Sequence, residues 1–350
     1  CTTSWNNPAG GDWATPANWT GDSVPGSGDA VCITLAGTYT VTLDSGEAQI
    51  ASFTLGGGAT GTQTLLVSSA AADELAYSSP SSIASNGVLT LGDGGADSSQ
   101  VDGGLTGTLD NSGTINVEQG GGGTRYVDSS IENEVGANVN IDSANTLSQA
   151  SSGATTLTNN GGTVTVSADA SYTLSNESGI SNLSGTYAND GATTLAGGTF
   201  VERGTVTGNQ VTLDASTLDD DTSAGAAPFL VNGTVDLVGT GANPGVASGQ
   251  VITISSAQDG ELTLSPKSAT FTNDGSIVVG TAGSTDSELD GVSTSLTNNG
   301  TISTVQGAGG LRYLNTNITN DVGGQIYIGS NDTESQAGFG ATTLTNDGGT

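Results

Sequence analysis

The chain contains one 55-residue segment twice. Residues 109–163 and 296–350 align without a gap at an offset of 187, and 31 of the 55 positions are identical. The matched positions include Arg125 with Arg312 and Tyr126 with Tyr313. A long segment repeated within one chain is typical of an array of stacked structural units. Because the second copy stops at Thr350 without a closing element, we expect the array to continue beyond residue 350.

A shorter motif recurs inside both copies and between them. It consists of an apolar residue, one further residue, an Asn, a Gly-containing turn and an alternating strand. Instances begin at Leu109, Leu157, Phe271, Leu296 and Leu344, and looser forms begin at Ile131 and Ile318. Within each run of the motif, successive starts are 22 to 26 residues apart. This period predicts the coils of a β-solenoid, in which each Asn hydrogen-bonds the Asn of the coils above and below.

The composition favours the same architecture. Val, Ile and Leu alternate with polar residues in short runs such as 39–43 and 251–254, which are bounded by Gly, Asn or Asp. With 56 Gly in 350 residues, no long window is suited to a helix, because each interior Gly costs about 1 kcal/mol relative to Ala. We predict an all-β solenoid over residues 36–350, with coils of roughly 22–26 residues and about 14 coils in total. The irregular stretches 218–228 and 240–245 are predicted to be loops that leave the array.

The first 35 residues are predicted to form a cap. All three tryptophans lie there, at Trp5, Trp13 and Trp19. A solenoid end exposes an unpaired sheet edge and an open apolar core, and large aromatic rings can cover both. Residues 1–35 are therefore expected to close the amino-terminal end.

The segment from Trp5 to Ile33 contains Gly-x-Trp, Asn-Trp, Val-Pro and Asp-x-Val-x-Ile. It resembles the start of large secreted bacterial and archaeal "beta strand repeat" surface proteins of the autotransporter-adhesin type, whose bodies are also Leu-Thr-Asn-x-Gly-Thr-Ile solenoids. Over the rest of the chain the resemblance is mainly one of composition. It implies display on the cell surface, adhesion or fibre formation, and it transfers no catalytic residue to this chain.

The two cysteines, Cys1 and Cys32, both lie in the cap. A disulfide between them would tether the start of the chain to the first coil and implies an oxidising, extracellular location. The alternative is that Cys1 is the lipid-bearing first residue of a mature lipoprotein and that Cys32 is a small buried core residue.

The charge balance excludes several classes of partner. Four basic residues stand against 35 acidic ones, which gives a formal net charge of -31. Such a chain repels nucleic acid and anionic lipid, and no apolar run approaches the roughly 18 residues of a transmembrane segment. His is absent, which removes the usual general base, so we expect no enzyme. Arg125 and Arg312 are expected to pair with Asp or Glu, or to pack their stems on Tyr126 and Tyr313.

Two kinds of site remain as expectations. Asp219, Asp220 and Asp221 offer hard oxygen ligands and are the best candidates for calcium, the one cofactor considered. Solvated turn acids are the competing interpretation. Sequons for asparagine-linked glycosylation occur at Asn18, Asn176, Asn182, Asn232, Asn299, Asn317 and Asn331.

These observations predict a non-enzymatic extracellular structural protein, either a surface filament or fibre or a component of a rod-like adhesin, that self-associates through solenoid stacking. The alternative is an adhesin stalk that acts as a monomer and binds a polysaccharide or a host surface through the loops near Asp219 and Asn243. A tailspike-like glycosidase comes third, because it would need facing carboxylates and aromatic sugar platforms.

Overall fold

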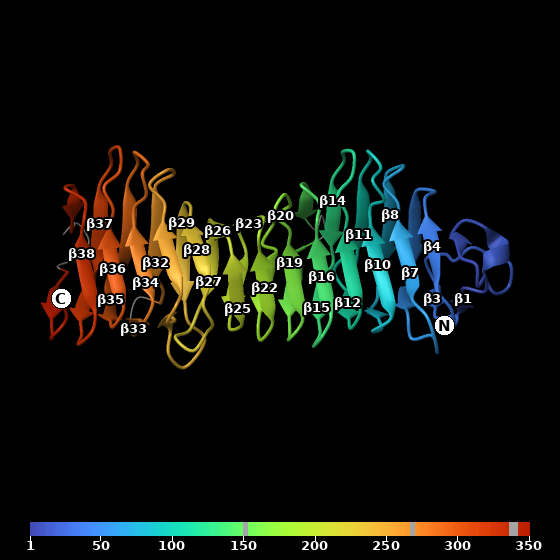
Figure 1. Ribbon diagram of the computed structural model, residues 1–350, viewed down its shortest axis with the longest axis horizontal. Helices are drawn as coiled ribbons and strands as arrows, with labels where there is room; N and C mark the ends of the chain where they lie inside the picture. Colours follow the sequence, from blue (N-terminus) through green and yellow to red (C-terminus); the bar gives the residue numbers. More distant parts are fainter. Residues whose placement is uncertain (150–152, 267–269, 336–341) are drawn as a thin grey trace. The chain divides into compact units, whose positions relative to one another are not determined.

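The computed structural model describes residues 1–149, 153–266, 270–335 and 342–350 (Figure 1). The described residues form strands and turns, with a single 3-10 turn at Pro16–Asn18. None of their helical segments is long and apolar enough to cross a membrane. The chain divides into two compact units, Cys1–Thr193 and Thr194–Thr350. The predicted cap, residues 1–35, is part of the first unit.

The first unit is built from three parallel sheets. The first sheet contains β1 (Thr3–Ser4), β3 (Ala30–Ile33), β6 (Ser52–Leu55), β9 (Ser81–Ile83), β12 (Thr108–Asn111), β15 (Ser130–Asn133), β18 (Thr156–Asn159) and β21 (Gly179–Asn182). The second contains β2 (Gly11–Asp12), β4 (Tyr39–Leu43), β7 (Gln63–Val67), β10 (Gly87–Leu91), β13 (Thr114–Val117), β16 (Asn138–Ile141), β19 (Thr163–Val166) and β22 (Thr186–Asn189). The third contains β5 (Glu47–Ile50), β8 (Asp73–Tyr77), β11 (Ser99–Asp102), β14 (Arg125–Asp128), β17 (Thr146–Ser148) and β20 (Ser171–Leu174).

Each full coil of this unit gives one strand to each sheet. Strands therefore pair in parallel with the strand one coil away, as in β7, β10 and β13. Inward residues share one register, so that Leu65, Leu89, Ile115, Val139 and Val164 form a continuous column. All five are buried. Burial of each such side chain contributes about 1.5–3 kcal/mol, which explains why the alternating pattern specifies this register.

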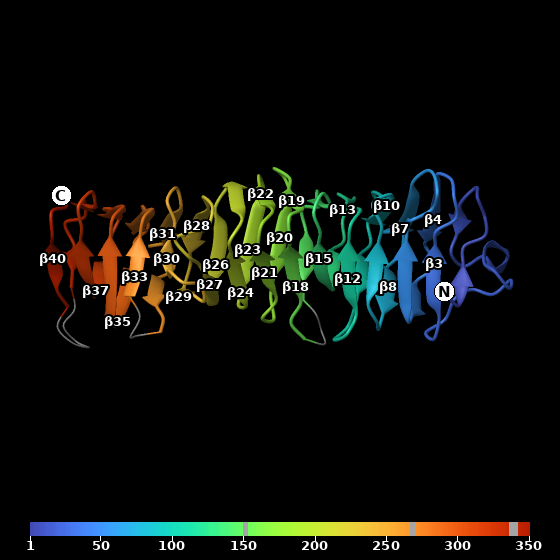
Figure 2. The same cartoon turned by 90° about the horizontal axis from the view of Figure 1, so that it is seen from below.

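The second unit is also a parallel solenoid. One of its sheets contains β24 (Thr199–Glu202), β27 (Ser216–Asp219), β29 (Thr234–Val238), β30 (Gly245–Val246), β32 (Gly260–Leu264), β33 (Thr270–Asn273), β35 (Ser287–Asn298), β37 (Arg312–Asn320), β39 (Thr333–Glu334) and β40 (Leu344–Asn346). Another contains β26 (Val211–Asp214), β28 (Pro228–Val231), β31 (Val251–Ile254), β34 (Ser276–Val279), β36 (Thr301–Thr304) and β38 (Gln325–Ile328). β23 (Ala192–Ala196) spans the division between the units, and β25 (Thr205–Gly208) follows β24. Within each unit, strands one coil apart in the same sheet lie side by side (Figure 2).

The two sequence copies fold in the same register. Leu109, Ile131 and Leu157 are in register in the first unit, and Leu296, Ile318 and Leu344 are in register in the second. The predicted all-β solenoid and its 22- and 26-residue coils are therefore confirmed. The coils near the start of the second unit are shorter: Phe200, Leu218 and Leu237 are in register although only 18 and 19 residues separate them.

The predicted loops differ in outcome. Residues 239–244 do connect two strands, but Leu218 and Asp219 belong to β27, and Leu218 is fully buried. The prediction of a loop at these two positions was wrong, because Ser216–Asp219 continues the alternation of the preceding coil and pairs with β24 and β29.

Candidate functional site

The three tryptophans of the predicted cap form a packed cluster, which we call the tryptophan cap. The ring centroids of Trp5 and Trp19 are 4.9 Å apart, and those of Trp13 and Trp19 are 4.8 Å apart, both edge-to-face. The Nε1 of Trp5 donates to the Asn7 carbonyl at 2.6 Å, and that of Trp19 to the Trp13 carbonyl at 2.7 Å. All three rings are buried, and the indole N–H groups of Trp5 and Trp19 are hydrogen-bonded.

Cys1 and Cys32 form a disulfide, with their Cα atoms 5.8 Å apart. Because β1 also pairs with β3, the start of the chain is held both covalently and by backbone hydrogen bonds. A sulfur in a disulfide cannot carry a thioether-linked lipid, so the structure favours the disulfide interpretation of Cys1.

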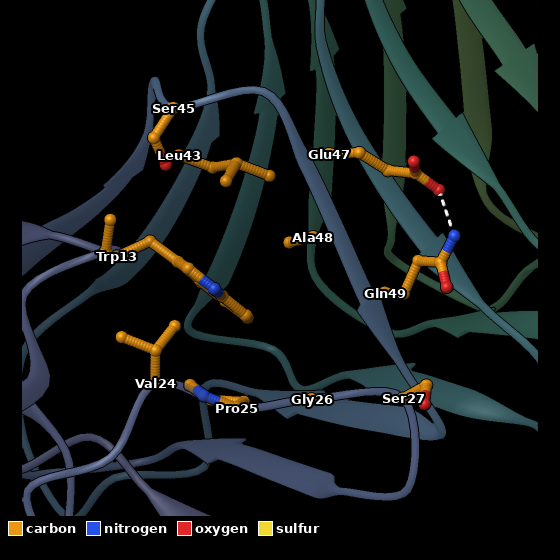
Figure 3. Close-up of a pocket in the computed structure, with 11 residues that line it drawn as sticks. Trp13, Val24, Pro25, Gly26, Ser27, Leu43, Ser45, Glu47, Ala48 and Gln49 are labelled. Atoms are coloured by element: carbon orange, nitrogen blue, oxygen red, sulfur yellow. Dashed lines mark hydrogen bonds between the residues drawn. The ribbon is translucent and has the colours of Figure 1, made fainter.

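A groove lies beside the cap in the first unit. Its first part is a hollow of about 360 Å³, lined by residues that include Trp13, Val24, Pro25, Glu47 and Gln49. Figure 3 shows Trp13, Val24 and Pro25 on one side of this hollow and the hydrogen-bonded pair Glu47 and Gln49 on the other. A second hollow of about 200 Å³ shares Ser27 and Gln49 with the first and extends to Asp102 and Gly104. We call the two hollows together the cap groove.

The floor of the cap groove is formed by Glu47, Gln49, Ala76 and Asp102, which belong to two rows of outward positions on the third sheet. Gln49, Ala76, Asp102 and Asp128 are in register on β5, β8, β11 and β14. Glu47, Glu74, Gln100 and Tyr126 form the neighbouring row.

Two hydrogen bonds involve polar groups of these rows. Gln100 Nε2 donates to Asp128 Oδ2 at 3.3 Å, and the Gly104 N–H donates to Asp102 Oδ1 at 2.6 Å. The same pairing recurs in the second unit with the partners exchanged, where the Asn315 amide donates to the Glu288 carboxylate.

The carboxyl groups of this face perturb one another. Burial raises the pKa of Asp128 to about 6; a hydrogen bond from the Gln149 N–H opposes this shift and the charge of Asp102 adds to it. Burial, together with the charges of Glu47, Asp102 and Asp128, also raises the pKa of Glu74. The face therefore gathers negative charge, which disfavours anionic ligands.

The predicted asparagine contacts are confirmed as two ladders. In the first unit Nδ2 of Asn111, Asn133 and Asn159 each donates to the Oδ1 of the Asn one coil further on, at 2.8, 3.0 and 3.0 Å, so that this ladder joins Asn111 to Asn182. In the second unit the ladder runs through Asn273, Asn298, Asn320 and Asn346, at 2.7, 2.7 and 3.1 Å. Seven of these eight residues are buried, so within each ladder the amide N–H of one Asn satisfies the amide oxygen of the next.

The prediction that the two repeated arginines pair with Asp or Glu was wrong. Arg125 and Arg312 are fully buried, and the ion pair found among the described residues joins Arg203 to Asp219 instead. Arg125 donates to the carbonyls of Asp97 and Glu118 at 2.9 and 3.2 Å. Arg312 likewise donates to the carbonyls of Val305 and Thr285 at 2.9 and 3.0 Å. Each guanidinium thus clamps the loops of adjoining coils through their backbones.

The three consecutive aspartates are divided among different donors. Asp219 pairs with Arg203 at 2.8 Å and accepts from Thr240 Oγ1 at 2.7 Å. Asp220 accepts from Gln250 Nε2 at 3.1 Å, and Asp221 accepts from the Asn243 N–H at 3.0 Å. The hydrogen bond of Asp221 places the end of β27 beside the connection that contains Asn243.

Within the described part of the chain, no group of three His, Cys, Asp or Glu side chains is arranged to hold a metal ion. Calcium binding by Asp219, Asp220 and Asp221 stays a prediction without a described set of ligands.

The sequons differ in access. Asn18 and Asn182 are buried, and both take part in side-chain hydrogen bonds, so a glycan at either would require displacement of its neighbours. Asn176, Asn299 and Asn331 are exposed, whereas Asn232 and Asn317 are partly exposed. Glycosylation stays a prediction for these five.

Comparison with known proteins gives little. No family model and no curated protein matches the chain. A crystal structure of a TibA fragment, hyper-glycosylated by TibC, is similar over 89% of this chain and 93% of that chain at 15% sequence identity, with a TM-score of 0.24. At that TM-score the likeness carries no argument, so the functional case depends on the residues of this chain.

Sequence reasoning missed the cap groove. Gln49 and Asp102 lie in strands of ordinary alternating pattern, and nothing local distinguishes them from other polar residues. The available signal was the register: placing successive strands of the third sheet under one another brings these positions into one row.

Proposed function

We propose that this chain is a non-enzymatic extracellular structural protein, a section of a surface filament or of a rod-like adhesin. The observation that carries this proposal is the pair of buried asparagine ladders, which add side-chain hydrogen bonds to the parallel backbone pairing of successive coils. A fold whose turns are linked in this way resists separation of coils along the whole length of each ladder.

Two further features support an extracellular structural role. The Cys1–Cys32 disulfide is the kind of link that persists in oxidising environments. The net charge of -31 favours solubility and discourages non-specific association, which suits a protein held at high local concentration on a surface. The absence of His supports a non-enzymatic role.

Self-association is tested by electron microscopy and analytical ultracentrifugation of the full chain over a hundredfold range of concentration. We expect filaments or bundles whose axial spacing is constant, and a sedimentation coefficient that rises with concentration. Single particles of constant sedimentation coefficient at every concentration would contradict the filament form and leave the monomeric adhesin stalk.

That second candidate, a stalk that binds a ligand, is favoured by a specific observation. The cap groove is a hollow with polar side chains in its lining, and a purely structural repeat has no need of one.

A further inference from the structure

We propose that the cap groove binds a neutral, linear glycan. The inference goes beyond the structural role and does not depend on filament formation, because every residue that carries it lies in the first unit.

The shape of the groove follows from the register of the third sheet. Ala76 lies between Gln49 and Asp102 in one outward row, and its short side chain leaves a hollow between two longer polar ones. Neighbouring strands are about 4.8 Å apart, so the row offers side chains at regular intervals across successive coils. A chain molecule with repeating units is the kind of ligand that can use such a row.

The chemistry of the lining suits hydroxyl groups. The Gln49 amide has two N–H donors, and its hydrogen bond to Glu47 uses one of them. The Asp102 carboxylate can accept about four hydrogen bonds and takes one from the Gly104 N–H. Amides and carboxylates that retain bonding capacity in this way can bind adjacent sugar hydroxyls as donor and acceptor.

The wall of the groove offers apolar contact mainly at Val24, which is partly exposed, whereas Trp13 and Pro25 beside it are buried. Trp13, Val24 and Pro25 lie on the side of the first hollow that faces Glu47 and Gln49 (Figure 3). Sugar rings present C–H groups on their faces, and such groups can pack against an aliphatic side chain such as that of Val24. Polar groups on the floor and apolar groups on the wall together match a molecule that is hydroxylated at its edge and apolar on its face.

Electrostatics decides the charge of the ligand. Glu47 and Asp102 line the groove and Glu74 lies in the adjoining row, whereas no Lys or Arg is among the lining residues. A uronate or sulfated glycan would be repelled. A lysine-rich peptide would be attracted, but the polar residues that shape the hollows include Ser27, Ser45, Gln49 and Ser78, which are neutral. This mixture favours a neutral, hydroxyl-rich ligand.

The test is isothermal titration of the full chain, in 0.15 M salt, with the hexasaccharides of cellulose, starch, laminarin, mannan and chitin. Tri-galacturonate and hexalysine serve as charged comparators. We expect at least one neutral hexasaccharide to bind, with an affinity that is insensitive to salt. We expect Gln49→Ala, Asp102→Ala and Ala76→Leu each to weaken that binding at least tenfold.

Asp110→Ala and Glu132→Ala are the matched controls, because they remove exposed carboxylates from the first sheet of the same unit. They are expected to leave binding unchanged, and thermal unfolding of every variant verifies that it folds. Ala76→Leu removes no polar group, so its effect reports on the hollow itself. The proposal is overturned if no neutral hexasaccharide binds, if hexalysine or tri-galacturonate binds more tightly, or if the controls weaken binding as much as the groove variants.

Discussion

At the scale of the residue, the asparagine ladders set this solenoid apart from a generic stack of strands. Each inner Asn both donates to one neighbour and accepts from the other, and its second N–H reaches a backbone carbonyl of the adjoining coil, as Asn133 does with Thr163 at 3.2 Å. The ladder stabilises the fold only while every rung is present, because a buried polar group that loses its partner lowers the stability by about 1–3 kcal/mol.

Replacement of one rung tests this argument. Asn133→Ala removes the donor to Asn159 Oδ1 and one acceptor of Asn111 Nδ2, so we expect a loss of roughly 2–4 kcal/mol in unfolding free energy. Asn140→Ala is the matched control, because the Asn140–Asn116 bond is only partly buried. We expect it to cost under about 1 kcal/mol. Chemical denaturation measures both, and equal effects of the two variants would contradict a special role for the ladder.

Asp220 gives a prediction about pH. Burial raises its pKa to about 7, although hydrogen bonds from Gln250 and the Asp221 N–H and the charge of Arg203 oppose the shift. An aspartate in an unfolded chain has a pKa of about 3.9. Between these values the folded protein holds a proton that the unfolded chain has lost, so this residue's contribution to stability falls as pH rises from about 4 to about 7 and stays low above that.

Asp220→Asn should therefore be more stable than the natural chain at pH 8, on the order of 3 kcal/mol, and close to it at pH 4. Asp221→Asn is the control of opposite sign. Burial would raise the pKa of Asp221, but hydrogen bonds from Asn243 and Ser223 outweigh this effect and leave the pKa lowered. The Asp221 carboxylate therefore stabilises the folded protein at pH 8, and its replacement by an amide should destabilise the protein at that pH. Thermal unfolding at the two pH values distinguishes the variants; a destabilised Asp220→Asn at pH 8 would refute the assignment.

At the scale of the element, the sequence predicted the coils that contain the repeated motif but not the coils that lack it. The period of the Leu-x-Asn motif specified coil length and register because one residue of slip would move every Leu and Ile from the core to the surface. The shorter coils near Phe200 and Leu218 contain no such motif, and the pattern alone could not place Leu218 in the core.

The arginines show a different limit of sequence reasoning. A buried cation normally pairs with a carboxylate, so Asp and Glu were the expected partners. The actual partners of Arg125 are backbone carbonyls, whose positions depend on how two loops from different coils meet. Gly120 allows this approach, since a Cβ there would lie 1.9 Å from Arg125 Nη2.

The disulfide joins the start of the chain to β3, and we expect it to stabilise only the strands near it. Its two cysteines are 31 residues apart, for which loop closure predicts about 3.5 kcal/mol of stabilisation. In a stack where each coil contacts only its neighbours, that effect should stay near the cap. We expect the double variant Cys1→Ser, Cys32→Ser to exchange amide hydrogens faster in β1 and β3 but not in β13 to β19. Hydrogen exchange read by mass spectrometry checks this, and uniform acceleration across the unit would argue against nearest-neighbour coupling.

At the scale of the whole molecule, the two units repeat one structural principle with different local detail. Both contain a buried asparagine ladder and a fully buried arginine that clamps loops. The tryptophan cap, the disulfide and the cap groove belong to the first unit, and the cluster of Asp219, Asp220 and Asp221 belongs to the second. Shared features of this kind serve the stack itself, whereas the features found in one unit are the candidates for a more specific role.

The central claim is that the coil is the mechanical unit of this protein. Single-molecule stretching of the full chain between its ends tests it most directly. A coil of 22 to 26 residues, released as extended chain, lengthens the molecule by about 80 Å. We predict a series of extensions of about this size, each the loss of one coil. Release of a whole unit in a single long step, or smooth lengthening without steps, would contradict a structure held together coil by coil.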